Sequence, residues 1–160
     1  QYFDLLDAGA TYYNDVLKKT DYMFWVKGIL GRVVYMTPDK YYILDAQIHN
    51  TDATTIMHHI FKETALKYKE QMLSGYKFPI PVLDFYQKGQ EGRHRAYAIK
   101  LIDPEIKIPV LVIKDFLTTK NTIITDVQNG VTLAEFKYLC EVYGVPYNEN
   151  YYHRIKNNAL

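Results

Sequence analysis

The chain has 160 residues, of which 48% are apolar and 23% are charged, and its net charge is +1. This length supports one globular domain with a hydrophobic core and is short for two. A charge this close to zero excludes a global attraction to nucleic acid or to a membrane surface, so any basic surface must be local. The single cysteine excludes an internal disulfide and fits a reducing compartment.

The sequence carries no signal for a membrane or for secretion. No apolar run approaches the ~20 residues that cross a bilayer, and the first residues lack the basic start and apolar run of a signal peptide. We therefore expect a cytoplasmic protein without a membrane partner. The chain begins with Gln1 rather than methionine, which is typical of an excised domain, a processed product or the ordered part of a longer protein.

The first third of the chain predicts short elements. Residues 1–10 suit a loose lead-in, and residues 11–19 suit a short helix with lysines at its end, as the helix dipole prefers. A strand is expected at residues 32–36, after a turn marked by glycines. A short helix with proline in its first turn is expected at residues 38–44, and the polar residues 45–52 predict a loop.

The longest predicted helix covers Thr54 to Leu73. Its apolar residues mostly recur at a spacing of three or four, and Gly75 suits its C-terminal cap. The sequence then predicts a strand, a turn, a short helix and a second strand, at residues 81–86, 87–89, 96–102 and 106–113. The second strand is apolar enough to be central in a sheet.

The C-terminal part predicts mostly helix. Residues 122–125 suit an edge strand. Thr132 and Glu135 form a capping box at the start of a helix that should end near Tyr143, before a glycine and a proline. Residues 151–156 suit a last short helix.

The most informative motif is Gln90-Glu91-Gly92-Arg93-His94-Arg95, which contains two of the four arginines of the chain. It lies between a predicted strand and a predicted helix, where unpaired N–H groups and the positive dipole end favour an anion. Glycine allows close approach of a ligand, and arginine offers forked donors for phosphate. The motif therefore predicts a phosphate site. The alternative is a solvated helix start on which Glu91 pairs with the arginines.

The sequence from Gly92-Arg93-His94-Arg95 to Ile108-Pro109-Val110 resembles the signature of the ParB/sulfiredoxin superfamily. Its members carry a Gly-x-His-Arg or Gly-x-Arg-Arg box that opens a helix, followed by a strand beginning Ile-Pro-Val. Three upstream segments resemble the family's first strand, its helix and the start of its next strand: residues 33–38, 54–73 and 75–82. The resemblance covers roughly residues 32–114 and is closest to members from phages and mobile elements.

The resemblance implies an α+β fold with a small mixed sheet, packed helices and short helical extensions at both ends. We therefore expect an N-terminal extension at residues 1–31, a nucleotide-binding domain at 32–116 and a C-terminal helical extension at 117–160. The extensions would connect the domain to neighbouring domains or subunits of a larger assembly. A phage origin would place the protein in the host cytoplasm or in the virion.

The resemblance also implies a chemistry. Sulfiredoxins carry their catalytic cysteine where Arg93 stands here, so sulfinic-acid repair is excluded. Free serine kinases of this fold have an acidic residue beside a Gly-x-His-Arg box, as Glu91 is here, and ParB proteins bind CTP with Mg. We therefore expect Mg with ATP, ADP or CTP, and either phosphoryl transfer or nucleotide hydrolysis.

The expected roles follow from this resemblance. Gly92, Arg93, His94 and Arg95 would hold the phosphates. Glu91 would act as base or Mg ligand, directly or through water, and His94 would contact phosphate or orient the acceptor. Secondary candidates for ligand contact are Gln90, Lys77 and Asp84; the last two are equally well explained as solvated residues.

Two further functions stay open. ParB-like proteins follow this domain with a helix-turn-helix, and residues 133–156 partly match that pattern, although they contain few basic residues. The other alternative is a structural or cargo protein of a phage particle with a degenerate site.

Metal binding by protein ligands alone and cysteine chemistry are not expected. His58 and His59 are adjacent, so on a helix they point about 100° apart and make a poor chelate even with His49. Cys140 lies among apolar neighbours in a predicted helix, which is typical of a packed thiol.

Overall fold

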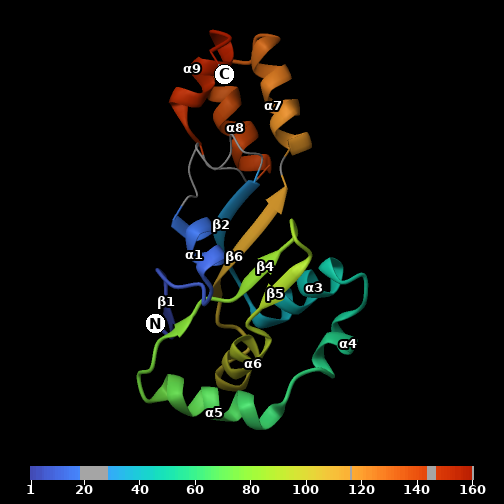
Figure 1. The fold of residues 1–160 in the computed structure, drawn as a ribbon, viewed down its shortest axis with the longest axis vertical. Helices are drawn as coiled ribbons and strands as arrows, with labels where there is room; N and C mark the ends of the chain where they lie inside the picture. The colour runs from blue at the N-terminus through green and yellow to red at the C-terminus, as the bar shows by residue number, and fades with distance from the viewer. Residues whose placement is uncertain (19–28, 116, 144–146, 160) are drawn as a thin grey trace.

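The computed structural model describes residues 1–18, 29–115, 117–143 and 147–159. This part of the chain is a mixed α+β protein, as the sequence predicts: it combines helices with two small sheets. Figure 1 shows the larger sheet in the middle of the molecule, one helix running across the lower end and three helices gathered at the upper end. No helix among the described residues is long and apolar enough to cross a membrane.

Four strands form the larger sheet, in the order β2 (Ile29–Met36), β6 (Ile108–Asp115), β4 (Val82–Asp84) and β5 (Gly89–Glu91). β6 pairs antiparallel with β2 and parallel with β4. Three of the four predicted strands are therefore confirmed, and β6 is central, as its apolar sequence indicates. β5 was not predicted. It pairs antiparallel with β4 across a turn in which Lys88 has φ 56°.

One residue, Gly92, connects β5 to α6 (Arg93–Ile102). The helix begins three residues before the predicted start because Ala96 N–H already bonds to Gly92 O, at 2.9 Å. Strand, glycine and helix thus follow one another without a loop, which fixes the motif against the edge of the sheet.

The predicted helix at residues 38–44 is longer in the structure, so the loop predicted over residues 45–52 is wrong for its first four residues. α3 (Pro38–Ile48) begins at Thr37, whose hydroxyl accepts the N–H of Lys40. It continues because Asp45 and Ala46 extend its buried face. A polar aspartate at this position suggested a loop, but the carboxylate has a buried partner in α6.

The long helix predicted from Thr54 to Leu73 is wrong as a single element. It is divided into α4 (Ala53–Met57) and α5 (Lys62–Leu73). Phe61 takes an extended conformation before α5, and its N–H binds a side chain of α6 instead of continuing the first helix. The predicted cap is confirmed, since Gly75 has φ 95° and donates to Met72 O.

The N-terminal residues are not a loose lead-in, which corrects that prediction. β1 (Phe3–Asp4) pairs in parallel with β3 (Phe78–Pro79). The predicted helix is present as α1 (Thr11–Lys18). Phe3, Ala8 and Val16 belong to the main core, and a side chain at Gly31 would collide with Val16.

The C-terminal helices are α7 (Leu117–Gln128), α8 (Leu133–Tyr143) and α9 (Glu149–Lys156). The edge strand predicted at residues 122–125 is wrong, because Ile123 and Val127 lie one turn apart and pack into a core that these helices share. The capping box is confirmed: Glu135 N–H donates to Thr132 Oγ1 at 3.2 Å. The predicted end of this helix at Tyr143 is confirmed, and the glycine predicted to stop it, residue 144, lies outside the described residues.

Candidate anion-binding site

The candidate site lies where β5 passes into α6, at Gly92. Its backbone has φ 109°, in the left-handed region, and a Cβ there would lie 2.8 Å from Cβ and 2.9 Å from Cα of Pro81. Both the conformation and the space therefore require glycine. No side chain among the described residues caps α6. The N–H groups of its first turn have no partner within the helix, and they lie at the positive end of the helix dipole.

Arg95 lies beneath the start of α6, with only 12% of its side chain exposed. Its Nη2 donates to Ile80 O at 3.3 Å, and its Nη1 lies 3.4 Å from Oε1 of Glu91. Within the described part of the chain, the buried Nε has no hydrogen-bond partner. Two long contacts leave this guanidinium with donor capacity for an anion.

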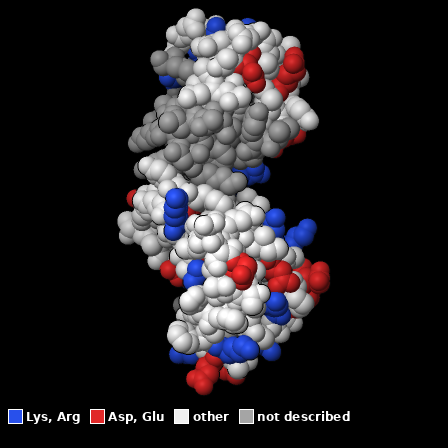
Figure 2. Space-filling view, turned by 90° about the vertical axis from the view of Figure 1, so that its right-hand side faces the viewer, with Lys and Arg blue, Asp and Glu red and all other residues white. Residues whose placement is uncertain are grey.

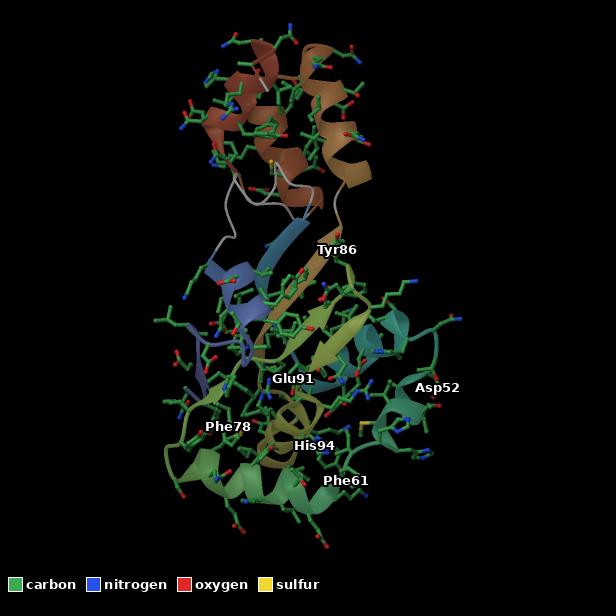
Figure 3. All side chains as sticks on the ribbon, viewed as in Figure 1. Asp52, Phe61, Phe78, Tyr86, Glu91 and His94 are labelled. Atoms are coloured by element: carbon green, nitrogen blue, oxygen red, sulfur yellow. The ribbon has the colours of Figure 1, made fainter. Side chains whose placement is uncertain are left out.

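Glu91 is the last residue of β5, directly before Gly92 (Figure 3). Its side chain is 54% exposed, and its Oε1 lies 3.4 Å from Nη1 of Arg95. A carboxylate held this weakly is free to turn toward a metal ion or a substrate proton.

Arg93 is bound to α3 rather than directed outward. Its Nε donates to Oδ2 of Asp45 at 2.7 Å and its Nη2 to Oδ1 at 3.1 Å. Asp45 is fully buried, and this hydrogen-bonded pairing raises the pKa of Arg93 above its ordinary value. Tyr42 Oη also donates to Arg93 O at 2.7 Å. The arginine therefore fixes the motif to the helix beneath it.

His94 points to the start of α5 (Figure 3). Its Nε2 accepts the N–H of Phe61 at 3.0 Å, and the two rings stack with centroids 5.8 Å apart. Because Nε2 is an acceptor, the neutral ring carries its proton on Nδ1. Burial and, secondly, the charge of Arg93 lower the pKa of His94. The histidine is thus neutral and ties α6 to α5.

The secondary candidates are dispersed. Gln90 lies beneath the motif, with Oε1 3.3 Å from Tyr41 Oη. Lys77 is exposed between α5 and β3. Asp84 is fully buried at the other end of the β4–β5 hairpin, where its Oδ1 accepts the N–H groups of Tyr86 and Gln87. Burial raises the pKa of Asp84, and its hydrogen bonds serve the turn.

The structure adds α3 residues that the sequence analysis missed. Tyr41 donates to Glu91 O at 3.1 Å, Tyr42 binds Arg93 O, and Asp45 pairs with the Arg93 side chain. The signal was present in the spacing: these residues share one helical face if the helix continues past residue 44. For Phe61, no spacing or motif in the sequence indicated its contact with His94.

The remaining polar candidates lie apart from the site. In the described segments, no group of three or more histidine, cysteine, aspartate or glutamate residues is placed to hold a metal ion. His58 and His59 are exposed. Cys140 is buried in the C-terminal core, where burial raises the pKa of its thiol to about 12. Its thiolate is therefore disfavoured at neutral pH.

No protein-family model matches the chain, and no curated protein or solved structure matches it significantly. The chemistry of the site therefore rests on its own geometry.

Proposed function

We propose that this chain is a ParB/sulfiredoxin-like domain that binds a nucleotide by its phosphates at the start of α6 and transfers or hydrolyses a phosphoryl group. The observation that carries the proposal is the uncapped N-terminus of α6 at Gly92, beside an arginine with an unpaired buried donor. N–H groups without a partner in the helix and a positive dipole favour phosphate over water.

The arrangement of elements supports the same proposal. A hairpin, a glycine, a helix and a parallel strand beginning Ile108-Pro109-Val110 follow in the order that the resemblance implies. The glycine stands where the backbone passes close to Pro81, as a direct strand-to-helix connection requires. The DNA-binding and structural alternatives have no comparable feature in the described residues to support them.

The geometry suggests a division of roles among the residues of the motif. The first-turn N–H groups and Arg95 would contact phosphate oxygens directly. Arg93 would act through Asp45 by holding the motif in place. His94 would offer its Nδ1–H, since its Nε2 is engaged with Phe61.

Glu91 is the residue that fits Mg or a proton to be removed, because its carboxylate is exposed and only loosely paired. Bound Mg would neutralise phosphate charge. Arg95 and the backbone N–H groups would then stabilise charge that develops on the transferred group. The acceptor of the phosphoryl group would be either water or a hydroxyl.

A screen for ligand-induced stabilisation tests the binding step first. ATP, ADP, CTP and GTP, each with and without Mg, should be compared by thermal shift. A ligand at 100 times its Kd adds about 2.7 kcal/mol of stability, so one of these nucleotides should raise the unfolding temperature clearly. A flat response to all of them, and to inorganic pyrophosphate, would contradict the proposal.

Two substitutions separate binding from chemistry. Arg95→Ala should weaken the best nucleotide by about tenfold to a hundredfold, since a hydrogen bond to a charged group is worth ~1.5–3 kcal/mol. Glu91→Gln should keep or improve affinity and lower phosphoryl transfer or hydrolysis. Both are measured by calorimetric titration and a phosphate-release assay.

The matched control is Arg154→Ala in the C-terminal helices, which removes the same charge far from the motif. It should leave nucleotide affinity unchanged. If Arg95→Ala binds as tightly as the wild type, the arginine is merely a surface partner of Glu91 and the site is not a phosphate cradle.

A further inference from the structure

Asp45 contacts two side chains: Arg93, which belongs to the motif, and His49, which does not. Its Oδ1 lies 2.9 Å from Nδ1 of His49 and 3.1 Å from Nη2 of Arg93, and its Oδ2 lies 2.7 Å from Nε of Arg93. Because a buried carboxylate must be fully paired, these contacts fix the orientation of both partners.

The contacts also determine which nitrogen of His49 is available. Nδ1 lies close to two acceptors, Oδ1 of Asp45 and, at 3.0 Å, the Asp45 backbone oxygen. The ring proton is therefore on Nδ1, and Nε2 is the nitrogen left for other contacts. The side chain is 33% exposed, and no described residue hydrogen-bonds to Nε2.

The direction of α3 places His49 at the site. α3 and α6 run antiparallel: Asp39 pairs with Lys100 at 2.7 Å toward one end, and Tyr42 binds Arg93 O at the other. Following α3 toward its C-terminus therefore leads past the start of α6. His49 lies one turn beyond Asp45 on the same helix face, about 6 Å further along. It lies beside the first residue of α6, because the same oxygen of Asp45, Oδ1, contacts both His49 Nδ1 and Arg93 Nη2.

We propose that His49 is a further ligand-contacting residue of this site, and that Asp45 is the residue that positions it. The proposal rests on the proposed function, because the ligand it contacts is the phosphate group held at α6. With both ring nitrogens protonated, His49 donates from Nε2 to a phosphate oxygen while its Nδ1–H stays on Asp45. One buried carboxylate thus holds Arg93 in place and orients His49 toward the anion.

The substitution that tests this is His49→Asn. The asparagine amide can replace Nδ1 as a donor to Asp45, but it has no group at the position of Nε2. Binding of inorganic pyrophosphate and of ATP with Mg is measured by calorimetric titration, and stability by thermal unfolding. We expect affinity to fall about tenfold or more, with an unfolding temperature close to that of the wild type.

His153→Gln in α9 is the matched control and should bind as the wild type does. A second measurement uses the wild-type protein alone, so it does not depend on a variant that folds. With 15N-labelled histidine, the Nε2 resonance of His49 should shift when pyrophosphate is added. An unchanged resonance, or an unchanged affinity in His49→Asn, would overturn the proposal.

The outcomes for the two proposals are distinguishable. If the wild type binds neither pyrophosphate nor a nucleotide, the proposed function and the role of His49 are both wrong. If the wild type binds, Arg95→Ala weakens binding and His49→Asn does not, then only the role of His49 is wrong. Loss of affinity in both variants supports both.

Discussion

Asp45 is the residue on which the position of the motif depends most. It is fully buried, and each of its oxygens holds Arg93. Other contacts to the same stretch come from Tyr41 and Tyr42, whose hydroxyl groups bind backbone oxygens of β5 and α6. Burial raises the pKa of both phenols, so they remain neutral donors. The motif is therefore held by buried hydrogen bonds from two neutral tyrosines and by one charged pair, between Asp45 and Arg93.

Replacing Asp45 tests this at the scale of one residue. Asp45→Ala leaves the largely buried guanidinium of Arg93 without its partner, and should lower the free energy of unfolding by about 3 kcal/mol. The measurement is urea-induced unfolding. Asp39→Ala is the control, because its ion pair with Lys100 is solvent-exposed and should contribute less than ~1 kcal/mol. Equal effects of the two substitutions would contradict a special role for the buried pair.

At the scale of elements, His94 joins two helix starts. It lies in the first turn of α6 and accepts the N–H of Phe61 before α5. The N-terminus of α5 has no side-chain cap from its own N-cap residue, Phe61. A phosphate bound at α6 would therefore sit beside a residue that also determines where α5 begins, so binding and the order of α5 should be linked.

The pH dependence of stability tests the link. The pKa of His94 is lower in the folded protein, so the unfolded chain binds the proton first, near its ordinary pKa of about 6.5. The stabilising contribution is complete above that value and is lost as the pH falls through the lowered pKa.

In His94→Gln the amide oxygen can accept the same N–H without titrating. The wild type should therefore lose more stability than this variant between pH of about 7.5 and about 5. Urea unfolding at both values measures the difference. Parallel losses in the two proteins would show that the Phe61 contact does not depend on a neutral histidine.

At the scale of the whole molecule, the described residues form two hydrophobic cores. The main core lies around the larger sheet and includes residues from β1 and α1. The second core is shared by α7, α8 and α9, which Figure 1 shows beyond the upper ends of β2 and β6. The N-terminal residues thus pack with the domain that carries the motif, while the C-terminal helices have a core of their own.

Phe136→Ala tests the independence of the two cores. The ring is fully buried in the C-terminal core, and its removal should destabilise that part by about 3–5 kcal/mol. Nucleotide affinity should stay as in the wild type, because the motif is supported by the main core. Hydrogen exchange followed by segment reports stability, and calorimetric titration reports affinity. A parallel loss of nucleotide binding would show that the cores are coupled.

Acidic and basic side chains intermingle over the lower part of the face in Figure 2, and the net charge of the chain is +1. We expect only weak duplex binding without sequence preference, which falls with salt as counterions are released. A nanomolar, sequence-specific complex at physiological salt in a gel-shift assay would instead support a helix-turn-helix at residues 133–156.

The sequence by itself determined the elements whose signals are local. The strands at β4 and β6 follow from runs of apolar and β-branched residues. The start of α8 follows from its capping box, in which the side chain of Thr132 accepts the N–H of Glu135 and the side chain of Glu135 accepts the N–H of Thr132. The glycine at position 92 marks the place where strand passes into helix. Each of these signals lies within a few residues of the structure it specifies, so no distant partner was needed.

The tertiary structure alone decided the elements that depend on distant partners. Asp45 is helical and buried because Arg93, 48 residues away, pairs with it. The predicted helix from Thr54 divides before Phe61 because His94 binds the Phe61 N–H, and residues 122–125 are helical because a second core receives Ile123. The intrinsic preference of a polar or β-branched residue for helix, strand or loop is worth less than ~1 kcal/mol. Burial against a specific partner contributes more free energy and therefore decides the secondary structure.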